Sequence, residues 1–427
     1  MNEINPRGKT VERALLVGAF FKQFDRPEAE SLLLELEELV VTLGVPIMGR
    51  MLVFSRETHA PYLLGSGKAA EIAERVRVEG LDSVIFDNEL TPSQQRNWEK
   101  ITGVAVLDRQ EVILDIFAQR AQTHEARLQI ELARMEYSLP RLTRAWGHLV
   151  RQGGGIGAKG EGESQLEQDK RRVRNTISRL KAQLEEIRTI RSTQRKDRKR
   201  TPIPNAAIVG YTNAGKSSLM RRLTGAEVLV EDKLFATLDT TTRKVALPNH
   251  QPLLLTDTVG FVRRLPHRLV EAFRATLEES VLAEFLIHIL DVSQPEVLTF
   301  YKTTMDVLSE LGSDTKRMII AFNKVDRIEE RSTLEPLRRQ FPDAHFISTH
   351  TGEGMDGLVD HMAELASNGS RVCTLELSVA AGDRLARLHR AAQILETHYD
   401  DDRVRLVAVL SPTLLRDYQD CIQEPAV

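Results

Sequence analysis

The stretch "NAAIVGYTNAGKSSLMRRLTG", residues 205–225, determines the fold of the central part of the chain. Its apolar start, Ala206 to Val209, predicts a β-strand, and a helical pattern begins after Ser217. Between the two lies the pattern G-x-x-x-x-G-K-S, which starts at Gly210. A strand, such a loop and a helix in this order are typical of a phosphate-binding loop, or P-loop. The stretch therefore predicts a nucleotide-binding α/β domain.

The residues of this P-loop suit the chemistry of a bound phosphate. Gly210 and Gly215 allow the loop to bend tightly, so that successive N–H groups and the start of the helix face the anion. Lys216 brings a positive charge to the β and γ phosphates, and the Ser217 hydroxyl can bind Mg²⁺. We therefore expect the loop to hold a nucleoside triphosphate together with a magnesium ion.

Two later motifs indicate which nucleotide binds. Each follows an apolar strand pattern: "PLLLTDTVGF" contains Asp257-Thr258-Val259-Gly260, and "RMIIAFNKVD" ends in Asn323-Lys324-Val325-Asp326. The Asp257 carboxylate can hold the water shell of Mg²⁺, and the Gly260 N–H can contact a γ-phosphate. The Asp326 carboxylate can accept two hydrogen bonds from guanine, which adenine cannot offer. The motifs therefore favour GTP over ATP.

Two further segments complete the predicted site. The stretch "AHFISTHTGEG" predicts a strand that ends at Ser348-Thr349-His350, where a GTPase places backbone groups against the guanine O6 atom. Because Ser-Ala is more frequent there, Thr349 and His350 are a departure. The stretch "FATLDTTTRKVAL" lies between the P-loop and the D-x-x-G motif, where a switch threonine closes over Mg²⁺ and the γ-phosphate. Thr237 and Thr241 are both candidates for this role.

The catalytic residues show a gap. Many GTPases carry a glutamine directly after the D-x-x-G glycine, where it orients the attacking water. Here that residue is Phe261, and a phenyl ring cannot orient water. We therefore expect slow intrinsic hydrolysis, with the water or the developing charge handled by a partner, by another switch residue, or by Arg263 or Arg264.

Composition bounds the class of protein. A chain of 427 residues is long enough for two to four domains, and its 41% hydrophobic and 28% charged residues are ordinary for a soluble protein. The only two cysteines, Cys373 and Cys421, form no C-x-x-C pattern, so neither a disulfide framework nor a zinc site is indicated. No signal peptide and no apolar run of about 18 residues is recognisable. We expect a cytoplasmic protein without stable membrane insertion.

Residues 1–110 alternate apolar runs with helical patterns, which predicts an α/β N-terminal domain. Within it, Gly65-Ser66-Gly67-Lys68 opens a helix, whose free N–H groups could hold an anion, for example the phosphates of a second nucleotide such as ATP. The alternative is an ordinary loop and helix start.

Residues 111–200 lose the strand patterns and predict a hairpin of two long helices. Apolar residues recur there at alternating spacings of four and three, as in helices packed against each other over roughly 40 Å. These positions are Leu128, Leu132, Met135, Leu139, Leu142, Trp146 and Leu149, then Leu166, Val173, Ile177, Leu180, Leu184 and Ile187. Pro140 should kink or break the first helix. Residues 192–205 lose the periodicity and add two prolines, which predicts a linker.

The turn of this hairpin contains GIGAKG, Gly155 to Gly160, which satisfies the G-x-G-x-x-G pattern of a dinucleotide site. No strand precedes it, so we interpret it as the tip of the hairpin and not as a cofactor site.

The second helix of the hairpin is strongly basic. Between Lys170 and Arg200 there are 13 Lys or Arg residues against three acidic ones. An excess of this size on a projecting helix favours a nucleic-acid backbone as partner, although basic runs are also common on solvated helix faces. The candidate RNA contacts are Lys159, Arg171, Arg172 and Arg174.

The rest of the chain completes the predicted architecture. Residues 201–367 form the expected GTP-binding domain. Residues 368–427 show strand "RVCTLELSV", helix "AAGDRLARLHRAAQILETHY", strand "RVRLVAVL" and helix "PTLLRDYQDCI", which predict a small unit for contact. The fold class is therefore α/β: a P-loop G domain with an α/β N-terminal domain, a long helical hairpin and a small α/β C-terminal domain.

In their order along the chain, these motifs resemble the HflX family of translation-linked GTPases, within the wider Obg-like group. The resemblance rests on "GGGIGAKGEGESQLEQDKRR", "GYTNAGKSSL", "FATLDTTTR", "DTVGFVRRLP" and "NKVD", and extends from about residue 14 to 365. It implies a GTPase that binds the large ribosomal subunit and its rRNA, with the glycine turn directed towards the peptidyl-transferase region. It also implies splitting or rescue of stalled or idle ribosomes under stress, and GTP hydrolysis stimulated by ribosomes. We expect a monomer.

The resemblance also implies site residues, carried over by position. The nucleotide contacts of the family fall on Gly210, Tyr211, Thr212, Asn213, Ala214, Gly215, Lys216, Ser217, Phe235, Ala236, Thr237, Leu238, Asp239, Asp257, Thr258, Val259, Gly260, Asn323, Lys324, Val325, Asp326, Ser348, Thr349 and His350. The Mg²⁺ ligands fall on Ser217 and Thr237, which favours Thr237 without excluding Thr241. The expected catalytic residues are Lys216, Thr237 and Gly260.

Two positions depart from the family pattern. Glu161 replaces a proline in the family's G-P-G-E-T loop and adds negative charge at the tip of the hairpin. Thr240 replaces the proline of a D-P-T turn and leaves that switch segment freer.

A different class of function is the alternative: a GTP-switched protein scaffold or regulator that does not act on ribosomes. Complexes that survive RNA digestion and ignore salt would favour this reading.

Overall fold

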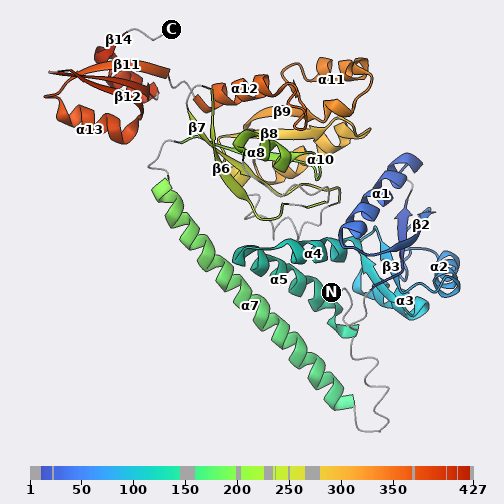
Figure 1. Ribbon diagram of the computed structural model, residues 1–427. Helices are drawn as coiled ribbons and strands as arrows, with labels where there is room; N and C mark the ends of the chain where they lie inside the picture. The colour runs from blue at the N-terminus through green and yellow to red at the C-terminus, as the bar shows by residue number, and fades with distance from the viewer. Residues whose placement is uncertain are drawn as a thin grey trace. The chain divides into compact units, whose positions relative to one another are not determined.

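The computed structural model describes residues 11–21, 24–144, 159–198, 203–225, 234–235, 237–248, 251–264, 279–367, 371–400, 402–410 and 412–423. Within these ranges the strands form three sheets, each covered by helices (Figure 1). The chain divides into two compact units. The first combines residues 1–188 with 231–239 and 259–276, and the second combines 189–230, 240–258 and 277–427.

The N-terminal sheet contains four parallel strands in the order β2-β1-β3-β4. Its elements are β1 (Ala14–Phe20), α1 (Arg26–Thr42), β2 (Ile47–Phe54), α2 (Ser66–Val78), β3 (Ser83–Phe86), α3 (Pro92–Thr102), β4 (Ala105–Asp108) and α4 (Arg109–Arg120). All seven residues of β1 are buried, as expected for a strand inside a parallel sheet with helices on its faces. The predicted α/β N-terminal domain is thus confirmed in its fold.

Helix α3 shows how local sequence sets the boundaries of an element. The side chain of Thr91 accepts a hydrogen bond from the N–H of Gln94, and the Gln94 side chain accepts one from the N–H of Thr91, which forms a capping box. The helix ends at Gly103, whose φ of 72° is left-handed. Its buried face carries Trp98, which packs against Phe86 of β3.

The hairpin segment contains α5 (His124–Ser138), a 3-10 turn η1 (Leu139–Arg144) and the 40-residue α7 (Lys159–Arg198). The α-helix ends at Ser138, two residues before Pro140, so the predicted break is confirmed. The Lys181 amino group lies 2.7 Å from the Glu136 carboxylate, so α7 and α5 are in contact. Positions Trp146 and Leu149 and the glycines Gly155 and Gly157 lie outside the described residues.

The length of α7 corrects the sequence interpretation. The linker was expected from Ser192, but the helix continues to Arg198. Apolar periodicity reports which face is buried, whereas Gln, Arg and Lys favour helix even where nothing packs on them. A helix of this length measures about 60 Å at about 1.5 Å per residue.

The central sheet has six strands in the order β10-β9-β8-β5-β7-β6, and β6 alone runs antiparallel to its neighbour. Its strands are β5 (Asn205–Gly210), β6 (Thr241–Ala246), β7 (Pro252–Asp257), β8 (Phe285–Asp291), β9 (Arg317–Asn323) and β10 (His345–Phe346). The helical segments are α8 (Lys216–Thr224), α10 (Val297–Glu310), η2 (Val325–Arg327), η3 (Arg331–Leu334), α11 (Glu335–Gln340) and α12 (Met355–Ser367). This is the expected P-loop fold.

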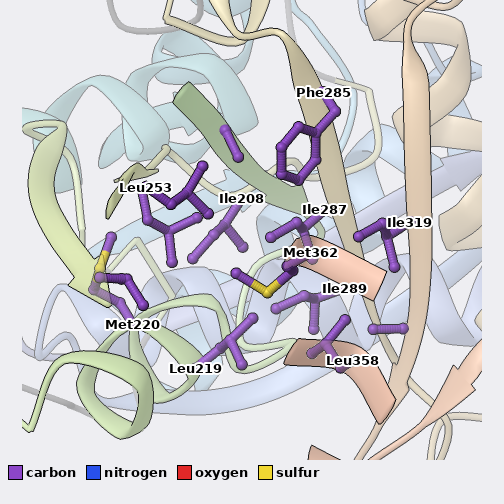
Figure 2. Close-up of a cluster of buried hydrophobic side chains, with 14 of the residues drawn as sticks. Ile208, Leu219, Met220, Leu253, Phe285, Ile287, Ile289, Ile319, Leu358 and Met362 are labelled. Carbon is purple, nitrogen blue, oxygen red and sulfur yellow. The ribbon is translucent and has the colours of Figure 1, made fainter. Parts of the chain in front are cut away.

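One face of the central sheet packs on α8 and α12 through a continuous hydrophobic cluster (Figure 2). The labelled side chains come from β5, β7, β8, β9 and the two helices: Ile208, Leu253, Phe285, Ile287, Ile289, Ile319, Leu219, Met220, Leu358 and Met362. All ten are fully buried. This core fixes α8, and with it the loop that precedes α8, against the strand ends that carry the other motifs.

The C-terminal sheet is antiparallel, in the order β12-β13-β11-β14. Its elements are β11 (Arg371–Ser378), α13 (Gly382–Ala391), β12 (Gln393–Asp400), β13 (Arg403–Leu410), α14 (Pro412–Asp417), η4 (Gln419–Cys421) and β14 (Ile422–Gln423). The predicted helix over residues 380–399 was therefore wrong in its second half, which forms β12. Pairing with β13 along its whole length outweighs the helical pattern that "AAQILETHY" also satisfies.

No helix in the ranges that the structure describes combines the length and the apolar character needed to cross a membrane.

Candidate functional site

The P-loop joins β5 to α8 in the second unit. Three of its residues have positive φ: Gly210 (150°), Asn213 (58°) and Gly215 (103°). A Cβ atom on Gly215 would overlap the side-chain amide of Asn323, so this position requires glycine for space as well as for conformation. The loop therefore has the sharp bend that the sequence pattern predicted.

Lys216, the first residue of α8, is buried. Its amino group donates a hydrogen bond to the carbonyl oxygen of Tyr211, at 2.7 Å, across the loop. Burial lowers the pKa of Lys216 to about 8, an effect that Asp257 opposes and Lys324 reinforces. A phosphate group beside the amino group would favour its charged form.

Ser217 and Asp257 bring two oxygen ligands together. The Ser217 hydroxyl donates a hydrogen bond to Oδ2 of Asp257, at 2.7 Å, although the residues are 40 positions apart. Asp257 is buried at the end of β7, next to β5. A hydroxyl and a carboxylate at this separation suit Mg²⁺, which prefers oxygen ligands and keeps several waters. The residues present therefore fit the expected ion.

Asn323 connects three of the predicted motifs. Its side-chain N–H donates to the carbonyl oxygen of Ala214 in the P-loop, at 2.8 Å, and its Oδ1 accepts from the N–H of Thr349, at 3.0 Å. The N–H of Val325 also donates to the carbonyl of Ile347. One buried amide thus holds the phosphate loop and the two predicted base-binding segments in register.

Lys324 and Asp326 follow in the same motif. Lys324 has a left-handed φ of 66°, and its amino group lies 2.7 Å from the carboxylate of Asp291 at the end of β8. Asp326 is exposed. The motif therefore presents an accessible carboxylate next to a lysine that is held in place.

The loop after β10 contains the last predicted contacts. Ser348 is fully buried, and its hydroxyl accepts a hydrogen bond from the N–H of Thr351 at 3.0 Å. Thr349 is half-buried and His350 is exposed. The backbone of this segment is thus ordered by its own side chains and by Asn323.

The switch segment around Thr237 belongs to the first unit. Phe235 is buried with φ of 56°, and its ring lies 4.5 Å from that of Phe117 in α4. The carboxylate of Asp239 accepts hydrogen bonds from Gln122 and Thr123 at the start of α5. Ala236 lies outside the described residues. Thr241, the other switch candidate, pairs with Asp257 in the β6–β7 ladder of the second unit.

The segment after D-x-x-G also packs within the first unit, because the division between the units falls between Thr258 and Val259. Phe261 is buried. Arg263 binds the Glu35 carboxylate, with Nε to Oε2 at 2.9 Å, and Arg264 binds the Asp87 carboxylate at 2.5 Å. Each of the two arginines considered for catalysis is therefore engaged with an acidic side chain of the N-terminal domain.

The basic candidates on α7 are exposed at Arg171, Arg172 and Arg174. The half-buried or buried positions Val173, Ile177 and Leu180 follow the predicted apolar stripe. Lys159 is the first residue of the helix, and its side chain lies outside the description.

Sequence reasoning missed several residues that position the site. Asp291 holds Lys324, Arg222 of α8 contacts the loop after β10, and Arg331 pairs with Glu353 of that loop. None of these residues belongs to a sequence motif from which its contact partner could be predicted. The only sequence signal is their place, at a strand end or within a helical turn or two of a motif.

Three families match successive parts of the chain. "GTP-binding GTPase N-terminal" matches residues 30–118, "GTP-binding GTPase Middle Region" matches 120–198, and "50S ribosome-binding GTPase" matches 205–324.

Curated relatives match nearly the whole length. The chain is 48% identical to GTPase HflX of Akkermansia muciniphila over 422 residues, which cover 96% of this chain and 97% of the relative. It is 41% identical to GTPase HflX of Magnetococcus marinus over 418 residues, covering 97% and 96%. It is 38% identical to GTPase HflX of Escherichia coli K12 over 418 residues, covering 97% of each.

Two similar solved structures are GDP complexes. The SsGBP–GDP complex is 26% identical, with a TM-score of 0.47, and the match covers 83% of this chain and 98% of that one. A GTP-binding protein from Sulfolobus solfataricus in complex with GDP is 26% identical, with a TM-score of 0.42 and coverage of 83% and 99%.

Proposed function

We propose a ribosomal function for this chain, which belongs to the HflX family of GTPases. In this proposal, its GTP cycle controls binding to the large ribosomal subunit and the splitting or rescue of stalled or idle ribosomes under stress. Membership of this family implies GTP hydrolysis, and the central domain of the chain matches a ribosome-binding GTPase family. The ribosomal substrate and the place of action, the cytoplasm, are the proposed part.

The arrangement of residues in the second unit supports the nucleotide site that we propose. The P-loop N–H groups and Lys216 bind the phosphates, and Asp326 accepts hydrogen bonds from the guanine. Ser217, with Asp257 beside it, holds Mg²⁺, which neutralises charge on the phosphate oxygens when bound. By its position in the family pattern, Thr237 is the switch threonine that we assign. By the same carry-over, Lys216, Thr237 and Gly260 are the residues that we expect to contact the transition state.

Hydrolysis by the chain alone should be slow. Phe261 occupies the position of the usual water-orienting glutamine, and its ring is buried. Arg263 and Arg264 are bound by Glu35 and Asp87, so neither can reach a phosphate without breaking an ion pair. A ribosome that supplies the missing group would stimulate turnover.

The observation that carries the ribosomal assignment is the basic face of α7. Three exposed arginines, Arg171, Arg172 and Arg174, lie within about one turn of α7, the helix that follows the glycine-rich stretch of the sequence. Charges placed in this way suit an RNA backbone, which releases counterions when it is neutralised.

Co-sedimentation tests the proposal. The protein with a non-hydrolysable GTP analogue should pellet with large subunits at low salt, and the bound fraction should fall steeply as salt rises. GDP or removal of magnesium should reduce pelleting. Absence of nucleotide-dependent pelleting at low salt would sink the assignment.

Charge reversal separates an RNA partner from a protein partner. Replacing Arg171, Arg172 and Arg174 by Glu should abolish pelleting while GTP binding is unchanged. The matched control reverses three exposed arginines outside α7, namely Arg77, Arg339 and Arg416. Complexes that survive nuclease digestion and ignore salt would instead identify a GTP-switched protein scaffold.

A further inference from the structure

The loop after β10, residues 348–354, is held by one arginine of the helix that follows the P-loop. Arg222 lies in the second half of α8, and its guanidinium faces three consecutive carbonyl oxygens of the loop. Nη1 donates to the carbonyls of Thr349 at 3.4 Å and His350 at 3.1 Å, and Nη2 donates to that of Thr351 at 3.2 Å. These partners are 127 to 129 residues away in sequence.

The next residue of the loop, Gly352, lies close to the Arg222 guanidinium. Gly352 has φ of +96°, and a Cβ atom there would overlap the Arg222 guanidinium. The chain therefore passes directly against the guanidinium group of Arg222. A planar group with several fixed donors is suited to gather three carbonyl oxygens, which the single ammonium group of a lysine cannot do with the same geometry.

A second ion pair fastens the far end of the loop. Arg331 binds the Glu353 carboxylate through both of its terminal nitrogens, at 2.5 and 2.9 Å. The N–H of Ser348 donates to the carbonyl of Glu353, and the N–H of Gly352 donates to that of Ser348. With Asn323 bound to the N–H of Thr349, the loop is held at its start, middle and end.

The orientation of each loop carbonyl also determines the orientation of the backbone N–H group that follows it. In a trans peptide the C=O of one residue and the N–H of the next point in opposite directions. The carbonyl of Thr349 faces Arg222, so the N–H of His350 is turned away from α8. In the proposed site this loop presents its backbone to the guanine O6 atom, which accepts hydrogen bonds.

We propose that Arg222 is a positioning residue for guanine recognition. It ties the base-reading loop to the helix whose first turn binds the phosphates, so that backbone donors meet O6 without reorganisation on binding. This inference rests on the proposed nucleotide site and does not depend on any ribosomal role.

Nucleotide affinity in the absence of ribosomes tests it. Arg222→Ala in the full chain should weaken GDP binding about tenfold, as expected for loss of hydrogen bonds from a charged donor. Arg222→Lys should resemble Arg222→Ala more than the wild type. The matched control is Arg221→Ala, which removes an exposed arginine from the adjacent position of the same helix and should leave the affinity within about twofold.

Base analogues distinguish positioning from general damage. Inosine diphosphate keeps O6 but lacks the 2-amino group that Asp326 reads, so Arg222→Ala should weaken GDP and inosine diphosphate by the same factor. The diphosphate of 2,6-diaminopurine riboside has an amine in place of O6. Its affinity should change little, and the preference for GDP over it should shrink about tenfold.

Three outcomes would overturn the proposal. They are equal weakening of all three nucleotides, an Arg221→Ala variant as weak as Arg222→Ala, and a wild-type protein that does not prefer GDP over the diaminopurine nucleotide. Ribosome pelleting at saturating GTP analogue should be the same for Arg222→Ala and wild type, so failure of the ribosomal assignment is recognised separately.

Discussion

At the residue scale, Lys216 is placed to offer a positive charge to the negatively charged phosphates of a nucleotide. The side chain is buried, its amino group is bound to a loop carbonyl, and its pKa is lowered to about 8. Removing it leaves the phosphates without their closest cation.

Lys216→Ala should therefore weaken GTP binding by about 100-fold, because a charge-assisted contact is worth about 3 kcal/mol. Titration with a fluorescent guanine nucleotide measures this change. Lys68→Ala is the control, since Lys68 lies in the first turn of α2 of the N-terminal domain and is paired with Glu71. A second bound nucleotide that persists in Lys216→Ala and disappears in Lys68→Ala would show that the N-terminal turn is a site of its own.

His288 in β8 is a buried residue without an evident role in binding. Neither ring nitrogen has a hydrogen-bond partner among the residues that the structure describes, and the ring stacks on Tyr301 at 5.3 Å. Burial, with a smaller effect from Lys216, lowers the pKa of His288 to about 3. Between pH 6.5 and about 3, His288 is therefore protonated in the unfolded chain and neutral in the folded chain.

The free energy of unfolding should fall as pH falls through this window, by about 1–2 kcal/mol from His288 at pH 5. We expect denaturant unfolding of the wild type to lose stability between pH 7.5 and pH 5 relative to His288→Phe, which cannot titrate. Equal losses in the two proteins would contradict the assignment.

At the scale of elements, two of the glutamates of helix α1 lie in different surroundings. Glu35 is buried and binds both Arg109 and Arg263, whereas Glu37 pairs with Arg50 near the surface. Buried ion pairs are costly to break on one side, because the remaining charge has no solvent to compensate it.

Glu35→Gln should lower the free energy of unfolding by about 3 kcal/mol, and Glu37→Gln by less than about 1 kcal/mol. Thermal and denaturant unfolding of both variants measure the difference. Similar small effects in the two variants would mean that the buried pair is readily replaced by water.

The packing of α7 rests on its apolar stripe. Leu180 is 1% exposed, while Leu184 on the same stripe is only half-buried. Leu180→Ala should therefore reduce the opening free energy of α7 by about 2–4 kcal/mol, and Leu184→Ala by less. Hydrogen exchange of the α7 amides reports both values, and equal effects would show that the stripe is not packed as described.

At the scale of the whole molecule, the nucleotide motifs and the hairpin tip should act separately. Gly157, which the sequence predicts at the hairpin tip, lies outside the described residues, and Lys159 begins α7. Their proposed role concerns the ribosome and not the nucleotide, since the P-loop at Gly210 is a different segment.

Replacing Gly157 by Val and Lys159 by Glu should leave GTP affinity within about twofold, as expected for changes outside a binding site, and should reduce pelleting with large subunits. Nucleotide titration and co-sedimentation of the same preparation measure the two properties. The opposite pattern, lost GTP binding with normal pelleting, would revive the dinucleotide interpretation of GIGAKG.

Local chemistry explains why so much could be predicted from the sequence. The strand ends, the P-loop bend and the break at Pro140 each depend on neighbouring residues, and all were found where expected. Strand β12 was missed because "AAQILETHY" satisfies helical and strand patterns alike, and pairing with β13 decides between them. Helix α7 proved longer than its apolar period, because that period marks burial and not helix length.

The sequence by itself determined the P-loop fold, the order of the nucleotide motifs and the family, because these depend on residue type at fixed short spacing. Only the tertiary structure decided which distant groups hold the site in place. Arg222 meets Thr349 and Arg263 meets Glu35 across 127 and 228 residues, respectively. In a sequence, an arginine at an exposed position cannot be distinguished from one in a buried ion pair. Its partner is therefore known only when packing brings the two chain segments together.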